Sequence, residues 1–179
     1  MTLRQRTALI AAFAAAALLI GYAAFAATRA SAAGGGSADP ASRNTALTDA
    51  AGTSALKGAV TSAVNAAFSY DYAKPNATQQ AADKWLTGRA RSQHATMFRA
   101  IRAQGPKLKL LLTTTVTGAG VQQLNGGRAR VLIYADQRTV ATPAKAKSPQ
   151  SSDAPAAFAA DAVKTASGWR LTTLDTLGQ

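Results

Sequence analysis

The chain has 179 residues, no Cys and a single His, and its 20 Lys and Arg residues against 8 acidic residues give a formal net charge of +12. The absence of Cys excludes intrachain disulfides and thiolate zinc sites. All acidic residues are Asp, so few groups are available for general acid–base catalysis. We therefore expect no enzyme activity, no cofactor and no metal. A basic surface favours anionic partners such as lipid head groups, wall polymers or nucleic acid.

Residues 1–30 are predicted to form a transmembrane anchor with a short cytoplasmic N-terminus. The 22 residues from Thr7 to Thr28 carry no charge. As a helix they would span about 33 Å, enough for a hydrocarbon core of roughly 30 Å. Arg4 and Arg6 precede this span and only Arg29 follows it closely, so the remainder of the chain is expected outside the cytoplasm. Small-x-small sequences near its end leave a cleaved signal peptide as the alternative.

A Gly-, Ser- and Pro-rich stretch predicts a flexible tether over residues 31–45, followed by an extracytoplasmic domain over residues 46–179. The domain begins with a pattern of apolar residues three and four positions apart, which predicts a first helix ending near Tyr70. Its apolar face consists of Leu56, Val60, Ala63, Val64, Ala67 and Phe68.

Two further helices are expected before residue 107. Asn76 is a predicted N-cap, with Gln79 at the capping-box position, and Gly88 is expected to end this second helix. The third helix is predicted over Arg89–Gln104 and is expected to end at Gly105-Pro106. Its apolar face holds Ala90, His94, Met97, Phe98 and Ile101, whereas Arg91, Arg99 and Arg102 share the opposite face.

After Pro106 the apolar period changes from 3.6 to 2, which predicts strands. We expect a first strand over about residues 107–117, a second over Arg128–Ala141, a third near Ala156–Thr165 and a fourth over Trp169–Leu177. Residues 142–155 are rich in Pro, Ser and Lys and are predicted to be a loop. The order predicts an α+β domain, in which three helices pack on the concave face of a curved four-stranded antiparallel sheet.

Four short motifs carry a family resemblance by their order and spacing. They are Tyr70-Asp71-Tyr72 at the end of the first helical segment, Leu86-Thr87-Gly88, the run Val131–Gln137 that ends in Asp136-Gln137, and Gly168-Trp169-Arg170-Leu171. Together with the N-terminal span they resemble the Mce-associated membrane proteins. The resemblance implies a nuclear transport factor two-like outer domain and an actinobacterial accessory subunit of complexes that import lipids or sterols. It implies no catalytic residues.

His94 and Asp136 are the two residues that an enzyme hypothesis would recruit. His94 lies on the predicted buried face of the third helix. It would act there either as a general base or as a core residue that is hydrogen-bonded to the backbone or to a Tyr. Asp136 is either an acid facing a cavity or a partner of Arg130 and Arg138, which share its strand face. Asp71 is expected to accept backbone N–H bonds in a turn.

Three functions remain open on the sequence. The first is a non-catalytic accessory subunit of an envelope lipid-import complex. The second is a module that binds a small apolar ligand such as a lipid, in a cavity lined by Trp85, Met97, Phe98 and Ile101. The third is a cyclase- or isomerase-like enzyme that uses His94 or Asp136. Nucleic acid is not an expected partner, because the basic residues form no continuous track with interleaved aromatics.

Overall fold

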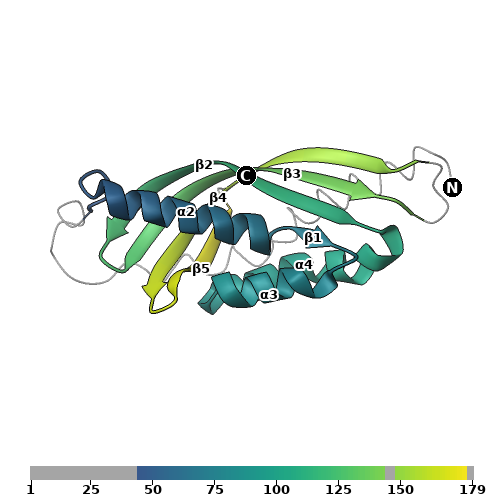
Figure 1. Ribbon diagram of the computed structural model, residues 1–179, viewed down its shortest axis with the longest axis horizontal. Coiled ribbons are helices and arrows are strands. Elements are labelled where there is room, and N and C mark those ends of the chain that lie inside the picture. Colours follow the sequence, from purple (N-terminus) through teal and green to yellow (C-terminus); the bar gives the residue numbers. More distant parts are fainter. Residues whose placement is uncertain (1–43, 144–147, 177–179) are drawn as a thin grey trace.

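The computed structural model describes residues 44–143 and 148–176. The predicted anchor, residues 1–30, and most of the predicted tether lie outside these ranges. Among the helices of the described ranges, none is long and apolar enough to cross a membrane. These ranges form an elongated α+β structure, in which helices lie on one face of a curved antiparallel sheet (Figure 1).

The first described helix, α2, spans Ala50–Ala67 and follows the predicted apolar period. Its N-cap residue Asp49 accepts a 2.8 Å hydrogen bond from the Gly52 backbone N–H, which satisfies one of the free donors of the first turn. Its buried residues are Leu56, Val60, Ala63, Val64 and Ala67, which confirms the predicted face.

Helix α3 spans Pro75–Trp85, and its start differs from the prediction. Lys74 occupies the N-cap position without a side-chain hydrogen bond, and Asn76 lies inside the helix. The proline explains the difference, because its fixed φ suits the first helical position and its missing N–H would be unpaired there in any case.

Helix α4 spans Gly88–Leu108, so Gly88 starts this helix instead of ending α3, and Pro106 does not terminate it. The helix continues one more turn and ends at Lys109, which adopts a left-handed conformation with φ 46°. A proline normally disfavours helical backbone at the preceding residue. Here that residue is Gly105, whose missing Cβ relieves part of the clash.

Five strands form the sheet in the order β1-β2-β3-β4-β5, with every neighbouring pair antiparallel. Their bounds are Tyr70–Asp71 (β1), Leu111–Asn125 (β2), Arg128–Ala141 (β3), Gln150–Thr165 (β4) and Gly168–Thr176 (β5). Gly126, in the turn between β2 and β3, and Gly168, at the start of β5, have φ values of +56° and +107°. Glycine adopts such values without a steric penalty because it has no Cβ atom.

The sheet has five strands rather than the predicted four because Tyr70–Asp71 forms a short edge strand on Leu111 and Leu112. Two residues are too few to show a strand period in a sequence. Strand β2 also begins later and runs longer than predicted. Strand β4 begins at Gln150, so residues 150–155 belong to the sheet and not to a loop, and even Pro155 pairs with Asp136 of β3.

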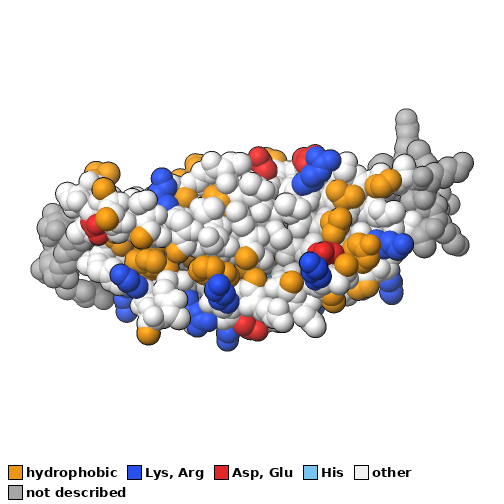
Figure 2. All heavy atoms as spheres, viewed as in Figure 1, with side chains coloured by type: hydrophobic (Ala, Val, Ile, Leu, Met, Phe, Trp, Pro, Cys, Tyr) orange, Lys and Arg blue, Asp and Glu red, His pale blue; other side chains and the backbone are white. Residues whose placement is uncertain are grey.

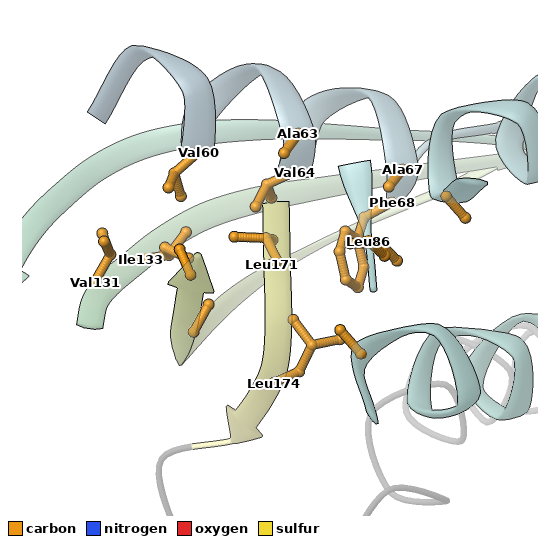
Figure 3. Packing of buried hydrophobic residues seen from close by; sticks show 14 of the residues in the cluster. Val60, Ala63, Val64, Ala67, Phe68, Leu86, Val131, Ile133, Leu171 and Leu174 are labelled. Atoms are coloured by element: carbon orange, nitrogen blue, oxygen red, sulfur yellow. The ribbon is translucent and has the colours of Figure 1, made fainter. Parts of the chain in front are cut away.

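The core lies between the concave face of the sheet and the helices. Figure 3 shows Val60 and Val64 of α2 pointing toward Ile133 of β3 and Leu171 of β5. These four side chains are at most 1% exposed. Register shifts interrupt β2 after Val116 and Val121. Such irregularities increase the local twist of a strand, which is consistent with the curvature around the helices in Figure 1.

Candidate binding groove

An apolar groove separates the C-terminal half of α4 from the far ends of β2, β3 and β4, toward the right of Figure 1. It encloses about 120 Å³. Met97, Phe98 and Ile101, which were predicted to line a cavity, are among its lining residues, whereas Trp85 is not. Trp85 instead packs half-buried against the core, with the Lys84 Nζ atom 4.7 Å from its ring centre.

Two periodicities build this groove. Residues at three- and four-residue spacing on α4 form one wall: Met97, Ile101, Gln104 and Leu108. Residues at two-residue spacing on β3 and β4 form the other: Gln137, Thr139, Ala141, Ser152, Ala154, Ala156 and Phe158. The remaining lining residues are Phe68, Phe98, Leu110, Leu112, Ala157, Leu174 and Thr176. None of these side chains is charged.

The size of the groove bears on what it can hold. Small-molecule sites usually enclose about 300–1,000 Å³, and this groove encloses only about 120 Å³. It is too small to bury a sterol or a complete lipid. Its apolar lining instead suits a few side chains or a short hydrocarbon segment.

His94 is a core residue and does not line the groove. It is 1% exposed, and its Nε2 atom lies 2.7 Å from the carbonyl oxygen of Ala67, the last residue of α2. Because a carbonyl only accepts, the neutral ring must donate through Nε2. The ring stacks on Phe98 at a centroid distance of 4.3 Å and meets the edge of Phe68 at 5.4 Å. Burial lowers the pKa of His94, partly offset by the Ala67 hydrogen bond.

Asp136 is exposed on the outer face of β3 and does not point into the groove. The two arginines that were predicted to pair with it bind other carboxylates. Arg138 lies 3.6 Å from Asp153, and Arg130 lies 3.0 Å from Asp161 and 2.6 Å from Asp175. These bonds raise the pKa of Arg130, the Asp175 hydrogen bond most of all. Neither Asp136 nor His94 is among the residues that line the groove.

The family-motif residues join elements of the fold. Leu86 forms an isolated bridge with Leu171 of β5, and the Thr87 N–H donates to the Leu171 carbonyl at 2.8 Å. Gly88 begins α4, and Gly168 and Trp169 begin β5. Gln137 donates to the Thr114 hydroxyl at 3.2 Å. These positions give the motifs a structural role.

Tyr70 and Asp71 form β1. The Asp71 carboxylate accepts a 2.8 Å bond from the Ala73 N–H, which confirms its predicted turn role. Tyr70 is buried against Gly105, and its hydroxyl has no partner among residues 44–143 and 148–176. Burial raises the pKa of Tyr70, and the Asp71 charge adds to this effect.

In the same described ranges, no group of three or more His or Asp side chains could hold a metal ion.

Sequence reasoning missed a set of polar residues that bind the edges of the sheet. These edge-capping residues are Asn44, Asn65, Ser69 and Gln93. Their contacts span 45 to 81 residues along the chain. The available signal was a polar side chain beside the apolar face of a helix, as at Asn65 and Gln93, but the distant backbone partner cannot be read from the sequence.

No family model and no curated protein matches this sequence. Solved structures with a similar fold include the three that are described next. An IcmL-like type IV secretion system protein from Legionella pneumophila aligns with a TM-score of 0.54 and 12% identity over 70% of this chain and 91% of that chain.

CagV, a VirB8 homolog from Helicobacter pylori, aligns with a TM-score of 0.51 and 13% identity over 70% of this chain and 99% of that chain. The putative transfer protein TraH from the Gram-positive conjugative plasmid pIP501 aligns with a TM-score of 0.51 and 8% identity over 70% of this chain and 94% of that chain. The described residues therefore share their fold with the IcmL-like protein and with the VirB8 homolog CagV.

Proposed function

We propose that this chain is a non-catalytic subunit of a multiprotein complex in the cell envelope. Its N-terminal residues would fix it in the membrane, and the α+β domain would present a binding surface outside the cytoplasm. The observation that carries the proposal is the fold, which is similar to proteins described as components of type IV secretion systems. At 12 and 13% identity, what these proteins share with this chain is architecture.

The complex that we propose is an Mce-type importer of lipids or sterols. This choice rests on the sequence motifs, in particular Tyr70-Asp71-Tyr72, Leu86-Thr87-Gly88 and Gly168-Trp169. The groove supports an interaction role, because it is apolar and uncharged and neither His94 nor Asp136 lines it. Its volume of about 120 Å³ gives less support to the alternative of a module that encloses a lipid.

The surface charge agrees with a partner other than nucleic acid. Figure 2 shows Lys and Arg side chains scattered singly over the visible face, and they form no continuous track. Phosphate-backbone recognition depends on such a track. A dispersed basic surface instead suits residence beside anionic lipid head groups.

The test is affinity purification of the full-length tagged chain from its own membranes in mild detergent, with proteins and lipids identified by mass spectrometry. Near-stoichiometric recovery of Mce-type envelope subunits would support the proposal. Recovery of secretion-system components would retain the envelope-subunit role and replace the complex. A single lipid class without protein partners would favour the carrier alternative and contradict the proposal. A tagged, unrelated single-pass protein from the same membranes serves as the control.

A further inference from the structure

The fold protects the outer edge of β2 along most of its length. β1 pairs with Leu111 and Leu112 at one end. Farther along, the Ser69 hydroxyl accepts from Thr114 N–H at 3.0 Å, and the Asn65 amide oxygen accepts from Val116 N–H at 2.8 Å. At the other end, Asn44 binds the Gln122 carbonyl and the Leu124 N–H at 2.9 and 3.0 Å.

The outer edge of β5 is protected in the same way. Thr87 donates its backbone N–H to the Leu171 carbonyl at 2.8 Å. The Gln93 side chain donates to the Leu174 carbonyl at 2.8 Å and accepts from the Leu174 N–H at 3.0 Å, as a neighbouring strand would. Edges covered in this way cannot recruit a foreign strand.

One edge differs. Strand β4 pairs with β3 from Gln150 to Val163, but its pairing with β5 begins only at Phe158. In the described part of the chain, no strand and no capping side chain binds the other edge of β4 over residues 150–157. These eight residues correspond to a free edge of about 27 Å at 3.4 Å per residue.

Pro155 indicates which backbone groups face outward. A proline inside a sheet is tolerated where its missing N–H would point away from the neighbouring strand. The nitrogen of Pro155 is therefore directed to the free edge and not to β3. Because backbone direction alternates along a strand, the N–H groups of Ser151, Asp153 and Ala157 share that side.

The free edge borders the apolar groove. Ser152, Ala154, Ala156 and Phe158, on the inner face of β4, line the groove, and Thr176 at the end of β5 lines it as well. A strand added to this edge would continue the row that β5 begins. Every second side chain of the added strand would then point into the groove, toward α4.

We propose that residues 150–157 of β4 accept an extended segment of a partner protein as an added strand, by β-augmentation. This inference rests on the proposed function, because it assigns the surface by which the envelope complex binds this domain. Charge complementarity defines the occupant. Inward side chains must be apolar, since none of the side chains that line the groove is charged. Acidic residues at a flank of the segment would suit Lys107 and Lys109, which are sequence neighbours of the lining residue Leu108.

A second copy of this chain fits the groove less well than a partner segment. Two β4 edges paired with each other would offer Ser152, Ala154 and Ala156 as inward residues. Their side chains are too short to fill a groove that reaches α4. A partner segment with Leu, Ile, Val or Phe at alternate positions would fill it.

The experiment uses the full-length chain in lipid nanodiscs and a phage-displayed library of random nine-residue peptides. Enriched peptides are expected to carry apolar residues at every second position. The best peptide is then synthesised in two N-methylated forms. Methylation of the backbone nitrogens that face β4 should weaken binding roughly ten-fold or more, whereas methylation of the alternate nitrogens should have little effect.

Variants of β4 complete the test. Ser151→Pro removes one outward N–H and should weaken binding roughly ten-fold, whereas Ser151→Ala should not. Ala154→Glu places a charge in the groove and should abolish binding, with circular dichroism to confirm folding. If Ser151→Pro disturbs the fold, the peptide methylation series still decides, because it leaves the protein unchanged.

Several results would overturn the proposal. These are the absence of alternating apolar peptides, equal binding of the two methylated forms, or unaltered binding by Ala154→Glu. Binding that appears only after deletion of residues 177–179 would mean that the chain covers its own edge. A stable dimer that Ser151→Pro dissociates would assign the edge to a second copy. Membrane purification tests the proposed function separately, so failure there leaves the peptide result interpretable.

Discussion

At the scale of single residues, the His94 side chain, which comes from α4, caps the C-terminal end of α2. The last carbonyl groups of a helix have no hydrogen-bond partner within that helix. The His94 ring donates a 2.7 Å hydrogen bond to one of them, the carbonyl oxygen of Ala67. The ring lies between Phe68 and Phe98 and does not line the groove, so the contacts that stabilise the fold hold it away from that surface.

His94 should make stability depend on pH. Its pKa is lowered by burial from the ordinary value of 6.5. Below pH 6.5 the unfolded chain therefore binds a proton that the folded state resists, and the free energy of unfolding should fall as the pH falls. Urea unfolding at pH 7, 6 and 5 measures this slope. His94→Gln keeps a donor without titrating and should show a shallower slope. Equal slopes for the two proteins would contradict the assignment.

Gly105 and Tyr70 form a second residue-scale contact. A Cβ atom at position 105 would lie 2.5 Å from the Tyr70 ring, which is too close for any real contact. Gly105→Ala should therefore destabilise the protein by about 1–3 kcal/mol.

Tyr70→Phe removes a buried hydroxyl that has no partner in the described ranges and should leave stability unchanged or raise it by up to about 1 kcal/mol. Thermal unfolding of the Gly105→Ala and Tyr70→Phe variants tests both expectations. A marked loss of stability in Tyr70→Phe would indicate that the Tyr70 hydroxyl has a hydrogen-bond partner in the folded protein.

At the scale of elements, side chains complete the sheet where strands are absent. Gln93→Ala would leave the Leu174 N–H and carbonyl unpaired beside the core and should cost about 1–3 kcal/mol. Gln104→Ala, an exposed glutamine on the same helix, is the matched control and should change stability by less than about 0.5 kcal/mol. Chemical denaturation of both variants tests this. Equal effects would mean that Gln93 contributes only helix propensity.

The types of the main helices and strands could be predicted from the sequence because their apolar periodicity continues over many residues. The buried face of α2 and the full extent of β3 were predictable for this reason. Errors occurred where local signals conflict with distant packing. Pro106 normally ends a helix, yet α4 continues past it, and Pro155 normally indicates a loop, yet it lies in a strand whose other edge is free.

The groove was only partly predictable. Helical period placed Met97, Phe98 and Ile101 on one face of α4, and they do line the groove. The opposite wall comes from strand residues that follow turns of unpredictable length, including Ser152 and Ala154 in a predicted loop. The free edge itself depends on where β5 stops relative to β4, a difference in register that a single sequence does not encode visibly.

At the scale of the whole molecule, Asn44 fixes where the chain enters the domain. Its side chain binds Gln122 and Leu124, near the turn between β2 and β3. The free half of β4 lies at the opposite end of the sheet, where Gln150 of β4 pairs with Ala141 of β3. An anchor that precedes Asn44 would therefore hold the entry end near the membrane and leave the acceptor edge farthest from it.

Asn44→Ala should loosen this attachment. Loss of the two bonds to β2 leaves partly buried backbone groups unpaired and should lower the free energy of unfolding by about 1–3 kcal/mol. Hydrogen exchange should quicken at Leu124 and Thr45, whose N–H groups lie in this contact. Asn76→Ala, an exposed position on α3, is the matched control. Unchanged exchange at Leu124 would show that the entry point is not held by this side chain.

The consecutive strand order also affects how this family of shapes can diverge. Because β3 and β4 are neighbours in both chain and sheet, two residues added to each strand at their shared hairpin would lengthen the acceptor edge by about 7 Å without rethreading the core. Paired losses would shorten it equally. Partner choice among homologues could thus evolve through indels at one hairpin, while the helices and the packed half of the sheet stay under a separate selective constraint.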